Sequence, residues 1–93
     1  MIIEINASIN DLEEYCDRYN LTLVIDQDGE HTWLARFRGA LDISGELAGY
    51  GDCPLNAVFN YLSNIAGHSV EHLNSVSTIK HLEVSDSVRK RLA

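Results

Sequence analysis

The sequence predicts an α+β domain in which an antiparallel three-stranded meander carries two helices packed on one face. Three observations support this fold class. Short segments with the two-residue alternation of a β-strand are joined by turn signals. Two longer segments instead repeat apolar residues every three or four positions, which is the period of a helix. The tail beyond the second helix is again strand-like and predicts one or two further strands.

The first helix is expected to begin near Ser8, after a short opening strand in residues 1–5. Ser8-Ile9-Asn10-Asp11 resembles a capping box with Asp in place of the usual Glu. Asn20, a residue that tolerates the left-handed conformation, is expected to end this helix. One apolar stripe follows the helical period between these ends and consists of Ile9, Leu12, Cys16 and Tyr19.

The meander is expected to follow directly. Residues 21–27 (LTLVIDQ) alternate in the strand period, and Asp28-Gly29 is a hairpin signal. Residues 31–39 (HTWLARFRG) resume the alternation, and this strand is expected to continue through Leu41 or Ile43. A turn at Ser44-Gly45 then leads into the third strand. The third strand is expected in ELAGYG, residues 46–51.

The second helix raises a question of chemistry, because two glycines and an acid precede it in residues 49–54 (GYGDCP). A phosphate-binding loop at a helix start needs free backbone N–H groups and a positive local field. Pro54 lacks one of those N–H groups, and Asp52 places a negative charge where the phosphate would lie. We therefore interpret the glycines as a sharp turn, and Asp52 or Cys53 as the helix cap. The apolar face of this helix consists of Leu55, Val58, Leu62, Ile65 and Ala66, and Gly67 is expected to end it.

The rest of the chain completes a single domain over residues 1–93. Residues 69–73 (SVEHL) and 77–84 (STIKHLEV) are expected to be strands separated by Asn74-Ser75. The core is expected to span residues 1–84. A short C-terminal helix or tail is expected over residues 85–93, with Ser85-Asp86 as its cap.

The charge of the chain is −7 and is concentrated in its first half. Residues 1–52 hold eleven acids against three arginines, a balance of −8, and residues 53–93 hold a balance of +1. A surface of this sign repels phosphate backbones, so direct nucleic-acid binding is not expected. Such a surface is attracted to basic protein surfaces, including those that normally hold nucleic acid. The alternative is that the acidity only keeps a small protein in solution.

No residue pattern points to catalysis, a metal site or a cofactor, so no enzyme activity is expected. Cys16 and Cys53 are too few for a disulfide framework or a zinc site. Gly67 would end the helix that could align His68 with His72 as metal ligands. No apolar run reaches the roughly 20 residues of a membrane span, and the first residues lack a basic signal-peptide region. A cytoplasmic protein without membrane contact is therefore expected.

The carboxylates of the first helix and first hairpin are the predicted binding residues, because they can compete with phosphates for arginine and lysine side chains. Tyr15 lies off the apolar stripe of its helix, and an exposed tyrosine among acids is a typical binding hot spot. The alternative for Tyr15 is a position half covered by a strand. The predicted partner-binding residues are Glu13, Glu14, Tyr15, Asp17, Asp26, Asp28 and Glu30.

Three motifs resemble a recurrent type of small phage and prophage protein: WLARFRG (33–39), GYGDCPLNA (49–57) and IAG (65–67). Those proteins run from a helix through a three-stranded meander and a G-x-G-x-x-P-x-x-A segment into a second helix, I-x-G and a strand-forming tail. The resemblance covers residues 9–84 and implies this fold and an origin in a mobile element. A weaker likeness over residues 26–65 is to HicB-type antitoxins, with D-x-D-G, a meander and G-D-x-P-x-x-A before a helix. The P-x-L-P-G segment of HicB domains is absent from this chain.

These observations lead to one functional expectation and two alternatives. The first is a small acidic, non-catalytic module from a phage or other mobile element, similar to anti-CRISPR proteins. It would inhibit a host defence or nucleic-acid-handling complex by occupying a basic surface of that host protein. The second is a HicB-like antitoxin that neutralises a small basic ribonuclease. The third is an accessory phage protein that forms a homodimer through an exposed edge strand.

Overall fold

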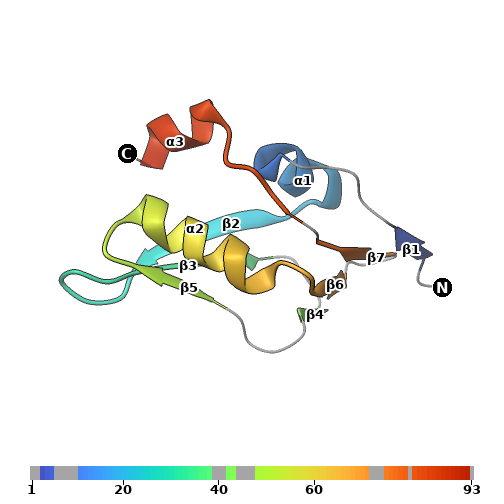
Figure 1. Ribbon diagram of the computed structural model, residues 1–93, viewed down its shortest axis with the longest axis horizontal. Coiled ribbons are helices and arrows are strands. Elements are labelled where there is room, and N and C mark those ends of the chain that lie inside the picture. Colours follow the sequence, from blue (N-terminus) through green and yellow to red (C-terminus); the bar gives the residue numbers. More distant parts are fainter. Residues whose placement is uncertain are drawn as a thin grey trace.

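The computed structural model describes residues 3–5, 11–38, 42–43, 48–71, 75–79 and 81–92. These residues form an α+β fold with two sheets and three helices (Figure 1), which confirms the predicted fold class. The elements in chain order are β1 (Ile3–Ile5), α1 (Leu12–Tyr19), β2 (Thr22–Gln27), β3 (Trp33–Arg38), β4 (Asp42–Ile43), β5 (Gly49–Gly51), α2 (Pro54–Ile65), β6 (Ser69–Glu71), β7 (Ser75–Thr78) and α3 (Asp86–Leu92).

The predicted meander is present as a three-stranded antiparallel sheet with the order β2-β3-β5. Its register places Ile25 opposite Ala35 and Ala35 opposite Gly49. The third strand begins at Gly49, and residues 46 and 47 of the predicted strand lie outside the described residues. The expected continuation of the second strand to Ile43 is wrong, because Asp42–Ile43 pairs with β6 in the other sheet. β3 ends at Arg38, and the alternative end at Leu41 lies outside the described residues.

The second sheet has the order β1-β7-β6-β4 and brings the first strand of the chain beside its last strand. The opening strand is confirmed, and it pairs in parallel with β7. The second tail strand begins at Ser75 and ends at Thr78, so the expected strand over residues 77–84 is wrong in its position. Ser75 belongs to the strand because it pairs with Ile3 of β1, whereas the pairing with β6 reaches only from Val76 to Thr78. Beyond Ile79, the β pairing of the described residues is limited to an isolated bridge between Glu83 and Asp11.

Helices α1 and α2 both pack on one face of the three-stranded sheet, as predicted. The ring of Phe37 on β3 lies between Tyr15 of α1 and Tyr61 of α2, with centroid distances of 6.0 Å and 5.3 Å. The aromatic trio lies within the apolar core. The buried core residues are Leu12, Tyr15, Leu21, Ala35, Phe37, Ala57, Val58, Tyr61, Leu62, Ile65, Val70, Ile79, Leu82, Val84 and Val88.

The boundaries of α1 differ from the expected ones at its start. The N-cap is Asp11, whose side chain accepts a hydrogen bond from the Glu14 backbone N–H at 3.0 Å. Asp-x-x-Glu is a better capping sequence than the one expected from Ser8, because the carboxylate also interacts favourably with the helix dipole. Residues 8–10 lie outside the described residues. Asn20 ends the helix in the left-handed conformation with φ of 55°, which confirms that prediction.

Candidate protein-binding surfaces

The GYG segment before α2 is a strand and not a phosphate loop. The helix lies directly on β5: a Cβ atom on Gly49 would collide with the backbone of Ala57 and Tyr61, and one on Gly51 with the backbone of Ala57. Neither glycine has a positive φ in the described backbone. The interpretation of these glycines as a sharp turn is therefore wrong. They are required because the helix approaches the strand too closely for any side chain.

The start of α2 confirms one of the two expected N-cap residues, although not through a side-chain hydrogen bond. Cys53 occupies the N-cap position but makes no side-chain capping hydrogen bond. The Asp52 carboxylate instead accepts a hydrogen bond from the Asn56 amide at 2.6 Å. Pro54 takes the first helical position, where the N–H group that it lacks would have no partner within the helix. An anion at the start of α2 would therefore be repelled by the Asp52 carboxylate. It would also lack the backbone N–H group that any residue other than proline would supply at position 54.

Two asparagines of α2 protect the outer edge of β5. The Asn60 side chain donates to the Tyr50 carbonyl at 2.6 Å, and the Asn64 side chain donates to the Ala48 carbonyl at 3.0 Å. Sequence reasoning missed this role, although Asn56, Asn60 and Asn64 recur with the four-residue spacing of one helix face. These bonds occupy carbonyls that would otherwise be open to another strand.

Tyr15 is a core residue, so its predicted role as an exposed hot spot is wrong. Its side chain is 1% exposed, and its hydroxyl lies 2.5 Å from the Ser77 hydroxyl of β7. Burial raises the pKa of Tyr15 to about 12, against the opposing effect of the Ser77 hydrogen bond. The expected stripe continued from Leu12 to Cys16, whereas the helix turns its Leu12 and Tyr15 side toward the sheet. Cys16, expected on the buried face, is only half-buried.

The predicted carboxylates of α1 are exposed, but two of the three are already in ion pairs. Arg91 of α3 contacts Glu13 at 2.8 Å, and the Ser87 hydroxyl donates to the same carboxylate at 3.2 Å. Arg18 lies 4.0 Å from Glu14 along the same helix. The pair between α1 and α3 joins residues 78 positions apart, so no local pattern could have indicated it.

The carboxylates of the first hairpin form a separate group at the far end of β2 from α1 (Figure 1). Asp26, Asp28 and Glu30 are exposed. Asp52 lies at the same end of the sheet, because Gly51 and Gln27 both face Trp33. Within the described residues, none of these four carboxylates has an ion pair. The predicted binding carboxylates are thus divided into two groups, one on α1 and one at the hairpin.

The outer face of the three-stranded sheet, opposite the helices, connects this acidic group to an exposed aromatic residue. The register aligns Asp26, Leu34 and Tyr50 in one row across the strands. Tyr50 is 53% exposed. Arg36 and Arg38 are exposed on the same face farther from the hairpin turn. The face therefore has carboxylates toward the hairpin and guanidinium groups toward its other end.

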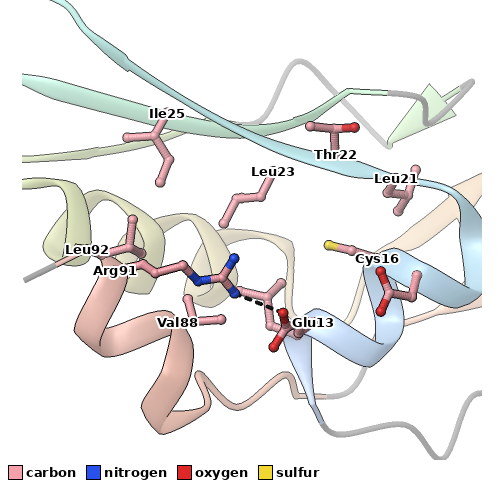
Figure 2. A pocket seen from close by; sticks show the side chains of 11 residues that line it. Glu13, Cys16, Leu21, Thr22, Leu23, Ile25, Val88, Arg91 and Leu92 are labelled. Carbon is pink, nitrogen blue, oxygen red and sulfur yellow. Dashed lines mark hydrogen bonds and ion pairs between the residues drawn. The ribbon is translucent and has the colours of Figure 1, made fainter.

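A cavity of about 340 Å³ opens between α1, α3 and β2 (Figure 2). The ion pair between Glu13 and Arg91 crosses its mouth. The Cys16 thiol borders the cavity, and burial, followed by the nearby carboxylates of Asp17 and Glu13, raises the pKa of this thiol to about 11. The thiol is therefore protonated at neutral pH and extends an apolar lining. The apolar lining residues are Leu12, Cys16, Leu21, Leu23, Ile25, Val88 and Leu92.

A second hollow, of about 620 Å³, lies between α2 and the segment that leads into α3. Phe59 and His81 border it, and the Arg89 guanidinium lies 5.5 Å from the centre of the Phe59 ring. This cation–π contact helps to hold α3 against α2. The hollow therefore includes contacts that stabilise the position of the C-terminal helix.

The described residues were also considered for a metal site and a membrane span, and the chain was compared with known proteins. Among the described residues, no three His, Cys, Asp or Glu side chains are placed to hold a metal ion; His31 and His81 are exposed, and His72 lies outside the described residues. None of the helices in the described part of the chain has the length and apolar character needed to cross a membrane. No protein-family model, curated protein or solved structure matches the chain.

Proposed function

We propose that the protein is a non-catalytic binding module that occupies a basic surface of a protein partner. The contact is made by the hairpin end, which we define as Asp26, Asp28, Glu30, Asp52 and the adjacent Tyr50. The observation that carries this proposal is that four exposed carboxylates and an exposed aromatic ring lie toward the same end of the three-stranded sheet. None of these carboxylates has an ion pair within the described residues.

The chemistry of the hairpin end suits arginine and lysine side chains. Carboxylates without an ion pair can accept charge-assisted hydrogen bonds, which are stronger than bonds between neutral groups. An exposed tyrosine supplies the apolar contact that often dominates a protein interface. The carboxylates of Glu13 and Glu14 contribute less, because each would first have to leave its arginine. The proposed surface is thus narrower than the one predicted from the sequence.

The proposed partner is a host protein whose basic surface normally holds nucleic acid. A domain with a net charge of −7 is repelled by nucleic acid and attracted to such a surface. By occupying it, the module inhibits a host defence or nucleic-acid-handling complex, in the manner of a phage-encoded anti-CRISPR protein. The charge and the resemblance to small phage proteins both support this role.

The proposal is tested by capturing partners from a nuclease-treated bacterial lysate with two matched variants. The triple change Asp26→Asn, Asp28→Asn, Glu30→Gln removes three charges at the hairpin end. The control Glu13→Gln, Glu14→Gln, Asp17→Asn removes the same charge from α1. We expect the hairpin variant to weaken capture about tenfold or more and the control much less, with a stronger effect at low salt.

Other outcomes would change the proposal in defined ways. Equal losses in the two variants would assign binding to net charge and not to the hairpin end. Full capture by both variants would contradict the proposed function. Capture of a small ribonuclease encoded beside this gene would instead favour the HicB-like alternative.

A further inference from the structure

The two edges of the three-stranded sheet are not equivalent. At the β5 edge, Asn60 and Asn64 of α2 bind the outward carbonyls of Tyr50 and Ala48. At the β2 edge, no backbone or side-chain hydrogen bond between described residues reaches the outward groups of Leu23 or Ile25. An edge strand with open N–H and C=O groups is a template for pairing with another strand. Strand β2 is therefore the available edge.

The hydrogen bonds of the hairpin show which groups of β2 face outward. The Asp28 N–H donates to the Thr32 carbonyl, and the Phe37 N–H turns away from β2 to the Tyr61 hydroxyl. Because bonding alternates along an antiparallel pair, Val24 and its even-numbered neighbours bond to β3. The backbone groups of the odd-numbered residues consequently point to the open edge. These residues are Leu23, Ile25 and Gln27.

The side chains of two of these residues line the cavity under β2. Leu23 and Ile25 are only partly buried and point into the space between α1 and α3 (Figure 2). Residues that lie opposite each other on paired strands place their side chains on the same face. A strand added to β2 would therefore direct the side chains opposite Leu23 and Ile25 into the cavity. The open edge of β2 therefore borders the apolar cavity.

The charges around this edge define the sign of the added segment. Asp17 borders the cavity and Asp26 lies on the outer face of β2; neither has an ion pair within the described residues. The Glu13 and Arg91 charges at the cavity mouth offset each other. On the outer face, a segment that lies along β2 would be directly adjacent to Asp26, whereas Arg36 and Arg38 lie one strand farther away on β3. Lysine or arginine would therefore be favoured at the position beside Asp26.

We propose that an extended segment of a protein partner adds to the outer edge of β2 as a fourth strand. Its apolar side chains at alternate positions fill the cavity, and its basic side chains, on the outer face, lie beside Asp26. This inference rests on the proposed role as a protein-binding module and specifies a segment of the partner. Strand addition of this kind obtains affinity from backbone hydrogen bonds and specificity from side-chain pockets.

The test uses the isolated protein and a defined peptide of alternating lysine and valine, roughly nine residues long, the length of an ordinary strand. In NMR hydrogen exchange at a peptide concentration of about 1 mM, we expect the amides of Leu23, Ile25 and Gln27 to slow about tenfold or more. The amide of Val24 already bonds to β3 and should change little. No change at the three outward amides would overturn the proposal.

Two matched peptides separate strand addition from other binding. N-methylation of the valine amides removes the backbone bonds but keeps charge and apolar surface, so it should abolish the protection. Replacement of lysine by glutamate should weaken binding about tenfold. If the N-methylated peptide or dodecylamine protects the outward amides equally well, the cavity is a site for amphipathic small molecules, and the proposal is wrong.

A variant of the protein tests the same edge from its own side. Ile25→Pro removes one outward N–H group while leaving the bonds to β3, and proline is tolerated on edge strands in this orientation. We expect it to lose peptide binding, whereas Val24→Thr on the outer face should retain it. Retained β2–β3 amide signals would show that the variant is folded. Normal peptide binding by Ile25→Pro would contradict the proposal.

The result is independent of the test of the proposed function. Loss of partner capture in the hairpin variant, without peptide binding at β2, would support the function and reject strand addition. Peptide protection at β2 together with normal capture by the hairpin variant would support strand addition and reject the hairpin end as the binding surface. Concentration-dependent protection of the outward amides without peptide would show that a second copy occupies the edge, and would overturn the proposal.

Discussion

At the scale of single residues, the Tyr61 hydroxyl completes the hydrogen bonding of the sheet. Among the described residues, the pairing of β3 with β5 ends at Ala35, and the Phe37 N–H beyond it donates to the Tyr61 hydroxyl at 3.1 Å. Both residues are buried. Burial is also the main reason that the pKa of Tyr61 is raised. The Tyr61 hydroxyl of α2 thus accepts the hydrogen bond of a β3 N–H group that lies beyond the pairing with β5.

The change Tyr61→Phe should therefore destabilise the fold. It removes the acceptor and leaves a buried N–H group without its partner, which costs about 1–3 kcal/mol. Urea unfolding should show a lower midpoint with an unchanged slope. The matched change Tyr50→Phe removes a hydroxyl from an exposed ring and should stay within about 0.5 kcal/mol of the parent. Equal effects would show that the Tyr61 bond is not important for stability.

Cys16 provides a prediction about pH. Burial raises the pKa of this thiol from an ordinary value of 9.0 to about 11 in the folded protein. Above pH 9.0 the unfolded chain loses the proton while the folded chain retains it, so the free energy of unfolding falls as pH rises toward 11. Urea titrations across this range should therefore show a smaller decline in Cys16→Ala than in the parent. Parallel declines would contradict the raised pKa.

At the scale of elements, the contact between α2 and β5 depends on two glycines. A Cβ atom on Gly49 would collide with helix backbone, which cannot move aside without separating the helix from the sheet. Gly49→Ala should therefore cost about 3 kcal/mol or prevent folding. Gly67 is a useful control because its Cβ would meet open space, although its φ is 84°. Gly67→Ala should cost only about 1 kcal/mol, and similar losses in both variants would exclude the close approach as the cause.

Local sequence patterns predicted the elements of the meander but not the tertiary contacts between elements that are distant in the sequence. Alternation and the Asp28-Gly29 turn were sufficient for the β2–β3 hairpin, because its register depends on neighbouring residues. The parallel pairing of β1 with β7 and the ion pair of Glu13 with Arg91 join distant parts of the chain. The two glycines of GYG are evident in the sequence, but glycine is required there because α2 packs directly on β5.

The candidate surface was predicted in part for the same reason. Charge counting correctly located exposed acids, yet pairing by Arg18 and Arg91 decides which acids are available. Tyr15 was placed off the buried face because the expected stripe continued from Leu12 to Cys16, whereas the buried residues are Leu12 and Tyr15. Tyr50 and the open edge of β2 could be recognised only when the strand order was known.

At the scale of the whole molecule, several contacts join the two sheets into one structure. Tyr15 of α1 bonds Ser77 of β7, and the Leu12 N–H donates to the Glu83 carbonyl at 2.9 Å. The Gly67 N–H after α2 donates to Ile79 at 2.6 Å. These contacts connect both helices of the three-stranded sheet to the second sheet and its C-terminal extension. We therefore expect the described parts of the chain to unfold together.

The single tryptophan allows this cooperativity to be measured. Trp33 lies in the three-stranded sheet, so its fluorescence reports that sheet, whereas far-ultraviolet circular dichroism reports all elements. Urea transitions by the two methods should coincide. Ser77→Ala, a change in the other sheet, should shift both transitions equally, by about 1 kcal/mol, because it removes the bond to Tyr15. A shift seen by circular dichroism alone would show that the second sheet unfolds separately, and that Tyr15 does not transmit stability between the sheets.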